Sequence, residues 1–198
     1  MANQQKQKVK VKKGTKKGFF DVEAPLTSTK ISLYASSKES LEGKTVKLDL
    51  TKNLRGKNLE LKMKIANEKD KLIGKPESIQ LMNSYIRRSV RKGTDYVEDS
   101  FEAECRDAVV RIKPLLVTRR RVSRAVLKSL RENTKKYLEA HLKTRNYEEI
   151  FSEIISNKLQ KQLAVKLKKI YPLALCEIRS FEVISKKQIQ ENPEQQKS

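Results

Sequence analysis

The sequence has 198 residues, a net charge of +21 at pH 7 and a pI near 10.0. It contains no apolar run of the roughly 18 residues that a transmembrane helix needs, and its first residues lack the apolar centre of a signal peptide. These properties argue against an integral membrane protein or a secreted one and favour a cytoplasmic protein. A charge surplus of this size requires a polyanionic partner, a membrane surface or a tolerance of self-repulsion.

The positive charge is concentrated in three segments. Residues 1–18 contain seven lysines and no acidic residue, residues 87–92 contain four basic residues, and residues 119–136 contain eight basic residues and one glutamate. Such concentration is typical of nucleic-acid-binding proteins. The first segment has almost no apolar residue, so we expect residues 1–18 to form a disordered basic arm.

Three strands are expected after the arm, over residues 30–36, 45–50 and 58–65. Each alternates apolar and polar residues with a period of two, which is the pattern of a strand with one buried face. The clearest is 58–65, in which every odd-numbered position is apolar. The loop between the second and third strands is long enough for a hairpin.

The next predicted elements are a helix and a hairpin. Residues 77–92 fit a helix with an apolar arc that includes Ile79. Residues 96–105 alternate as a strand, and residues 108–118 are expected to pair with it in the antiparallel sense. Pro114 has no N–H for a sheet ladder, so it predicts either an edge strand or a bulge.

The last part of the chain is predicted to be mainly helical. Residues 123–142 fit a long amphipathic helix with Ser123 as its N-cap. Residues 146–170 fit two short helices or one bent helix, with Asn146 able to cap the start. Residues 173–184 read as a final strand that must pair with strands far back in the sequence.

The order of these elements predicts an α+β fold, with a mostly antiparallel sheet or a small β-barrel and three to four helices. We expect one RNA-binding domain over residues 19–184, between the basic arm and a polar tail over residues 185–198. No internal repeat or long flexible linker interrupts this range.

Basic residues follow one side of the predicted helix 123–142. Arg124, Lys128 and Arg131 are spaced by four and three residues, which places them within about 60° of arc. Residues 119–121 are arginines at the approach to the helix N-terminus, where positive charge is unfavourable unless an anion is bound. The residues expected to contact RNA are Lys10, Lys12, Lys13, Lys16, Lys17, Arg87, Arg88, Arg91, Lys92, Arg119, Arg120, Arg121, Arg124, Lys128 and Arg131.

These residue types suit the phosphate backbone, because a guanidinium binds two oxygens at once. Neutralisation of about ten phosphates would give a log–log salt slope near −9 on a duplex. The aromatic residues available for base stacking are few, and most are expected to pack in the core. The candidates are Phe19, Phe20, Tyr34 and Tyr96. Without an RNA-recognition or zinc-finger motif, the expected mode is backbone and shape recognition of structured RNA.

The sequence gives little indication of catalysis. The single histidine, His141, lies on the apolar side of a predicted helix, where we expect a packed structural role. The two cysteines are far apart and match no metal spacing, so we expect reduced thiols. One acidic group alternates along a predicted strand and fits a solvated face better than a metal site. It comprises Glu98, Asp99, Glu102, Glu104 and Asp107.

Four segments occur in a familiar order and spacing: "GFFDVEAP", "LEGKTVKLDLTKNL", "SYIRRSVRKGTDYVEDSF" and "RDAVVRIKPLLVTRRRVSRAVLKSLR". Together they resemble the archaeal and eukaryotic small-subunit ribosomal protein family S-three-A-e, also called e-S-one. The similarity covers about residues 17–184, and the length resembles that of archaeal members. The sequence departs from the family at Phe19 and Phe20, where Trp and Tyr are frequent, and the arginines at 119–121 fall where members vary.

The resemblance implies a structural constituent of the small ribosomal subunit that binds small-subunit rRNA on the platform, near the mRNA exit. It implies neighbouring platform proteins and mRNA near its exit as partners, and no membrane. No catalytic residue, metal ligand or cofactor is expected. The alternatives are an RNA-processing enzyme or another, non-ribosomal, basic RNA-binding protein.

Overall fold

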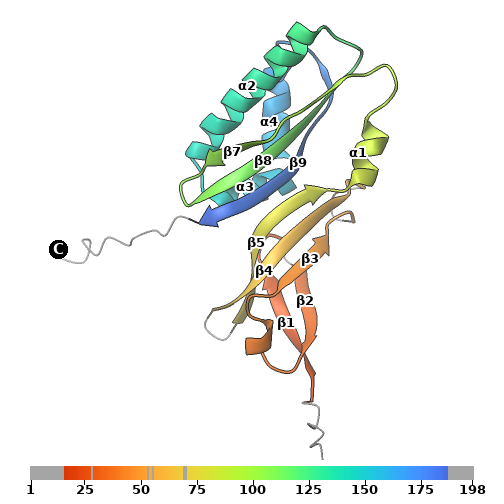
Figure 1. Cartoon of the computed structure of the whole chain (residues 1–198). Helices are drawn as coiled ribbons and strands as arrows, with labels where there is room; N and C mark the ends of the chain where they lie inside the picture. Colours follow the sequence, from red (N-terminus) through yellow and green to blue (C-terminus); the bar gives the residue numbers. More distant parts are fainter. Residues whose placement is uncertain (1–15, 28, 53, 55, 69–70, 187–198) are drawn as a thin grey trace, which may run out of the picture.

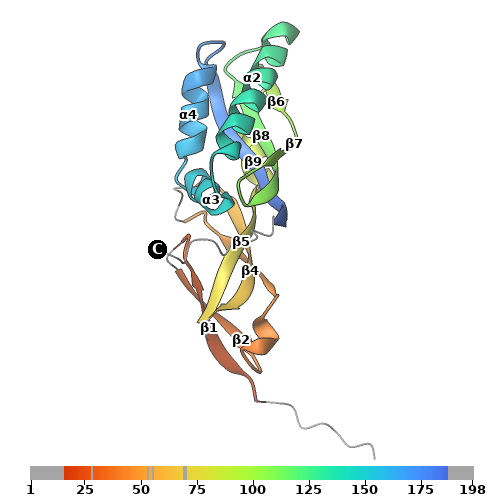
Figure 2. The same ribbon diagram turned by 90° about the vertical axis from the view of Figure 1, so that its left-hand side faces the viewer.

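A computed structural model describes residues 16–27, 29–52, 54, 56–68 and 71–186 of the protein (Figures 1 and 2). Most of the predicted basic arm, including Lys10, Lys12 and Lys13, lies outside these residues, as does the end of the predicted polar tail.

The described residues form an α+β fold, as predicted, with one open nine-stranded sheet that is mostly antiparallel and four α-helices. The sheet does not close into the small barrel that the sequence also allowed. The strands are β1 (Gly18–Ala24), β2 (Thr29–Ala35), β3 (Thr45–Asp49), β4 (Leu59–Glu68), β5 (Lys71–Leu81), β6 (Tyr96–Glu98), β7 (Phe101–Glu104), β8 (Ala108–Thr118) and β9 (Leu173–Lys186). The helices are α1 (Asn83–Ser89), α2 (Arg124–Lys143), α3 (Tyr147–Ile155) and α4 (Lys158–Leu167), with a 3-10 turn, η1, at Glu39–Leu41.

Strand β5 connects the two halves of the molecule. It pairs with β4 along one edge, while its other edge pairs with β1 at one end and with β9 at the other. In Figures 1 and 2, β1–β4 form one lobe with β5, and β6–β9 form the second lobe with α2, α3 and α4. The β1–β5 pair is parallel, and the other strand pairs are antiparallel.

The prediction of a helix over residues 77–92 is wrong at its start. Residues 77–81 belong to β5, where Ile79 is fully buried opposite Phe181, and α1 covers only Asn83–Ser89. The register between β4 and β5 shifts beside Glu77, so the buried positions change from even to odd numbers along β5. This extra residue hides the period of two from a sequence pattern.

Other predicted elements are confirmed with small changes. The expected strand 96–105 is divided into β6 and β7 at Asp99, and both parts pair with β8. The register of β8 against β9 shifts at Pro114, which confirms the bulge although β8 is not an edge strand. The final strand, β9, pairs with both β8 and β5.

The hydrophobic core lies between the sheet and the three helices of the second lobe. Phe151 of α3 and Phe181 of β9 are fully buried and meet edge to face, with ring centroids 4.9 Å apart. A smaller cluster, which includes Val22, Leu41 and Leu72, fills the far end of the first lobe. Each large apolar side chain that is fully buried, such as Phe151 or Phe181, stabilises the fold by roughly 1.5–3 kcal/mol.

The three helices of the second lobe differ in how their N-termini are capped. Ser123 caps α2 as predicted, because its Oγ accepts a hydrogen bond from the Val126 N–H at 3.5 Å. Residues 146–170 form two helices, and Asn157 between them adopts a left-handed conformation with φ of 58°. Asn146 occupies the N-cap position of α3, but its side chain makes no capping bond.

Candidate nucleic-acid interface

Two basic segments that are separate in the sequence are joined through Asp95 and Thr118. The Thr118 N–H donates to the Asp95 carbonyl at 2.8 Å, and the Asp95 N–H donates to the Thr118 Oγ1 at 3.0 Å. The Asp95 carboxylate accepts the Val122 N–H at 2.9 Å. These bonds hold the residues before β6 against the turn that follows β8, and Thr118 is fully buried at the junction.

Six basic residues flank this junction, and we refer to them as the arginine surface. Two precede Asp95 in the chain, three follow Thr118 in the turn, and one begins α2. The members are Arg91, Lys92, Arg119, Arg120, Arg121 and Arg124. All six side chains are exposed, and none has an ion pair with a carboxylate within the part of the chain that the structure describes. Because none of the six is ion-paired with a described acidic side chain, each can bind an external anion.

The basic stripe continues from the arginine surface along α2. Lys128 and Arg131 are exposed, as predicted, while Leu130, Leu138 and Leu142 on the opposite side are fully buried. Lys128 lies 3.9 Å from Glu132, which is an exposed pair of little energetic weight. The first turn of α2 contains no acidic residue, and the Asp95 carboxylate near the helix start accepts the Val122 N–H and is ion-paired with none of the described arginines there.

The basic residues of α1 lie where the helix dipole favours them. Arg87 and Arg88 occupy the last turn and are both exposed. The Arg88 guanidinium donates to the Asn58 Oδ1 at 2.6 Å and to the Ser84 carbonyl at 3.3 Å. Arg88 is therefore partly engaged by the protein, whereas Arg87 has no ion pair among the described residues.

The described lysines of the predicted arm lie far from the arginine surface. Lys16 and Lys17 are exposed at the start of β1, at the opposite end of the molecule from the start of α2 (Figure 1). The Lys17 Nζ lies 5.9 Å from the centre of the Tyr34 ring. The basic residues predicted from the sequence therefore do not form a single patch. They divide into the arginine surface with the stripe on α2, the neighbouring end of α1, and the distant pair Lys16 and Lys17.

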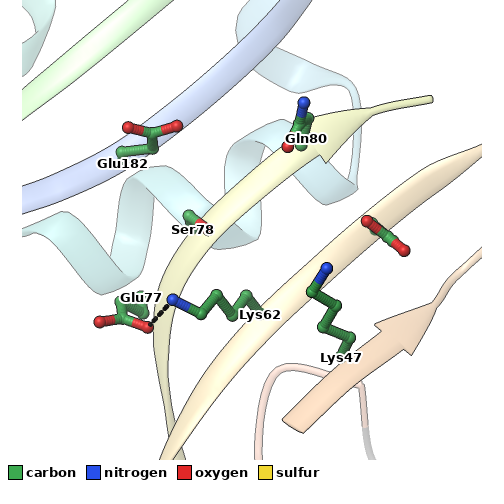
Figure 3. Close-up of a pocket in the computed structure, with 7 residues that line it drawn as sticks. Lys47, Lys62, Glu77, Ser78, Gln80 and Glu182 are labelled. Carbon is green, nitrogen blue, oxygen red and sulfur yellow. Dashed lines mark ion pairs between the residues drawn. The ribbon is translucent and has the colours of Figure 1, made fainter. Parts of the chain in front are cut away.

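The charged side chains on the sheet in Figure 3 have a different environment. They line an open groove of about 410 Å³, which mixes acidic and basic residues. Lys62 and Glu77 form an ion pair of 2.8 Å there. Nearby, Arg111 pairs with Glu102 at 2.7 Å and Arg179 pairs with Glu98. The cations of these pairs are already neutralised by the protein.

The family model described as the Ribosomal S3Ae family matches residues 5–187, which is most of the chain. The chain belongs to this family. The predicted resemblance is thereby confirmed, and the S3Ae family is one of ribosomal structural proteins rather than enzymes. An RNA-processing enzyme is accordingly not supported.

Individual relatives agree with the S3Ae assignment. The chain is 29% identical over 174 residues to small ribosomal subunit protein eS1 of Nanoarchaeum equitans, covering 84% of this chain and 88% of the relative. It is 28% identical over 169 residues to the protein of that name in Pyrobaculum islandicum, covering 84% and 73%. The corresponding protein of Methanothermobacter thermautotrophicus is 28% identical over 106 residues, covering 53% and 54%.

In this S3Ae family member, His141, the histidine that was considered for catalysis, is partly buried and lies beside a carboxylate. The His141 Nε2 lies 2.8 Å from the Glu153 carboxylate, which also pairs with Arg145. Burial lowers the pKa of His141, and the nearby charges of Arg145 and Lys166 lower it further. No group of three or more metal-ligating side chains occurs among the described residues, and in the same range no helix is long and apolar enough to cross a membrane.

The thiols do not resemble reactive cysteines. Neither Cys105 nor Cys176 forms a disulfide, and Cys105 is buried. Burial, together with the charge of Glu177, raises the pKa of Cys176 to about 12. This thiol therefore stays protonated at neutral pH.

One buried ion pair could not be found from the sequence. Lys57 is only 7% exposed, and its Nζ lies 2.5 Å from the Glu177 carboxylate and 2.7 Å from the Asn157 Oδ1. It connects the loop before β4 to β9 and to the turn between α3 and α4. Since 120 residues separate the two charges, no local pattern signals the pair.

Helix α4 is a further basic element, which the sequence analysis did not single out although its lysines are evident in the sequence. Helix α4 and the residues that follow it carry five exposed lysines and no acidic residue. These are Lys158, Lys161, Lys166, Lys168 and Lys169. The Lys166 Nζ lies 4.2 Å from the centre of the Tyr137 ring, so α4 adds positive charge beside α2.

Proposed function

We propose that the protein is a structural constituent of the small ribosomal subunit and that it binds small-subunit rRNA through the arginine surface. The observation that carries this proposal is the set of exposed cations without acidic partners at the Asp95–Thr118 junction. Family membership and the names of the relatives support the ribosomal setting.

The proposed mode of binding is recognition of the phosphate backbone and of RNA shape. Each guanidinium presents a planar fork to two phosphate oxygens, and the N-terminus of α2 adds partial positive charge beside Arg121 and Arg124. If the six members of the arginine surface each neutralise one phosphate, the log–log salt slope on a duplex is about −5. Arg87, Lys128 and Arg131 extend the contact on either side.

The resemblance to the family suggests the position within the ribosome. We propose a place on the platform of the cytoplasmic small subunit, near the mRNA exit, with neighbouring platform proteins and mRNA as further partners. The two-lobed shape in Figure 1 suits this setting, because one end presents the arginine surface and the other remains available to a second partner.

Co-sedimentation with small subunits tests the proposal. The protein should travel with small subunits in a sucrose gradient at moderate salt, and Arg124→Glu with Arg131→Glu should release it while circular dichroism shows an intact fold. Both side chains are exposed on α2, so the double variant is expected to fold.

A matched control reverses two lysines on the same helix but away from the arginine surface, Lys136→Glu with Lys143→Glu. Both are exposed in the second half of α2. This variant should keep most of the association. Wild-type protein found only in the unbound fractions would refute the ribosomal role, and equal release by the two variants would refute the assignment to the arginine surface.

A further inference from the structure

Two aromatic side chains are exposed side by side on the first lobe. Phe19 of β1 is 75% exposed and Tyr34 of β2 is 60% exposed, and they are directly opposite each other in the strand pair. Their ring centroids are 5.1 Å apart, with an interplanar angle of 49°. Among the large apolar side chains that are exposed in the described residues, Phe19 and Tyr34 are two aromatic rings in contact with each other.

These two rings are not part of either hydrophobic core cluster. The opposite face of the same hairpin supplies Val22 and Ala35 to the smaller core, with Phe20 and Leu33 packed against it. Phe19 and Tyr34 point the other way because neighbouring residues alternate across a strand. An exposed aromatic pair of this kind is a typical mark of a binding surface.

The charged residues around the two rings favour the approach of an anionic chain from one side. Lys16 and Lys17 lie three and two residues before Phe19 and are exposed, and the Lys17 Nζ lies 5.9 Å from the Tyr34 ring centre. On the other side, Asp21 accepts a hydrogen bond from the Ser32 Oγ at 2.6 Å. An anionic chain would therefore approach the rings from the side of the two lysines and avoid the side of Asp21.

We propose that Phe19 and Tyr34 form a stacking platform for an unpaired base of single-stranded RNA, with Lys16 and Lys17 contacting the adjacent phosphates. The inference rests on the proposed RNA-binding function but adds a second contact, at the end of the molecule opposite the arginine surface (Figure 2). Aromatic rings next to cations are the usual elements of single-strand binding, because every base has a face that stacks.

The tilt of the rings limits how a base fits. Two rings inclined by 49° form a V-shaped surface rather than a flat one. One base therefore stacks on one ring and meets the second ring with its edge.

A fluorescence experiment tests the platform directly. The chain contains no tryptophan, so Phe19→Trp introduces a single tryptophan at the platform, whose fluorescence can be excited selectively over that of the six tyrosines. A single-stranded oligoadenylate of about 10 nucleotides should quench this fluorophore on stacking. Inorganic polyphosphate, which has the charges but no bases, should not quench it. Absence of quenching by the oligoadenylate overturns the proposal.

Leucine substitutions separate stacking from simple apolar contact. Phe19→Leu with Tyr34→Leu keeps apolar area but removes both rings, and it should weaken oligoadenylate binding by about five-fold or more. Unchanged affinity in this variant overturns the proposal. Thermal melting checks that the variant is folded.

The two RNA contacts can be tested independently. Arg124→Glu with Arg131→Glu removes charge from the α2 end of the molecule, so it should leave quenching of the F19W protein by oligoadenylate largely unchanged. If that reversal fails to weaken rRNA binding while quenching persists, the proposed function at the arginine surface fails and the platform stands. If the oligoadenylate does not quench the F19W protein, while the charge reversal does weaken rRNA binding, the platform fails and the arginine surface stands.

Discussion

The arginine surface and the charged face of the sheet contain the same kinds of cation in opposite environments. On the sheet, Arg111 and Lys62 each lie within 3 Å of a carboxylate, at 2.7 and 2.8 Å. At the start of α2, Arg119 to Arg121 have no such partner in the described residues. Net charge therefore identifies a basic protein, but the presence or absence of an internal partner distinguishes the proposed binding surface from the charged face of the sheet.

The energetic contrast between these regions has a simple origin. Exposed ion pairs contribute only about 0–1 kcal/mol each, so the pairs on the sheet add little to stability. They do prevent mutual repulsion of like charges. The arginine surface keeps that repulsion, which opposes folding, and a bound polyanion would remove it.

The sharpest test of this difference removes two arginines from each region. Arg121→Gln with Arg124→Gln should weaken rRNA-fragment binding by about a hundred-fold at low salt and make the salt slope shallower by about 2. Arg111→Gln with Arg179→Gln changes the net charge equally and should alter the affinity by less than about two-fold. Filter binding over a salt series measures both. Equal losses would show that net charge alone governs binding.

The buried cation gives the largest expected effect on stability. Lys57→Met leaves the Glu177 carboxylate without its partner and should lower the free energy of unfolding by about 3–5 kcal/mol. Lys62→Met, which breaks the exposed pair with Glu77, should cost about 0–1 kcal/mol. Urea denaturation measures both values. A similar cost for the two variants would contradict the buried role of Lys57.

The N-cap of α2 is expected to have a smaller effect. Ser123→Ala removes the hydrogen bond to the Val126 N–H and should lower the free energy of unfolding by about 0.5–1 kcal/mol. Asn146→Ala at the start of α3 serves as the control, because that side chain makes no capping bond, and it should cost less. The reverse order in thermal melts would show that Ser123 does not cap α2.

The smallest expected effect concerns pH. Burial and the nearby Arg145 and Lys166 lower the pKa of His141 below its ordinary 6.5, so the unfolded chain binds the proton more readily than the folded protein does. Stability should therefore fall as the pH drops from about 7 through 6.5, until His141 is also protonated in the folded protein. His141→Gln should reduce this loss in urea melts across the range. A steeper loss in the variant would contradict the lowered pKa.

Some elements were predictable because their signals are local. The alternation in residues 58–65 predicted β4, and the stripe of Arg124, Lys128 and Arg131 predicted the exposed side of α2. Ser123 was assigned to a cap from its own chemistry, and Pro114 to either an edge strand or a bulge, of which the bulge is observed. Each of these signals depends on neighbours within a few residues, which is the range in which sequence patterns are informative.

Other features were not predictable for the same reason. Strand β5 was missed because a bulge at Glu77 changes the phase of its buried residues. Phe19 and Tyr34 were among the four aromatic residues named as stacking candidates, but that the two lie side by side required the pairing of β1 with β2. The contacts of individual basic residues with RNA stay predictions.

By itself, the sequence determined the class of the fold, the surplus of positive charge and the family, because these follow from composition, periodicity and short motifs. Only the tertiary structure decided which cations lie together and which are neutralised. Asp95 and Thr118 are 23 residues apart, and Lys57 and Glu177 are 120 apart. Such contacts depend on strand pairing across the whole sheet, and local residue patterns do not encode that pairing.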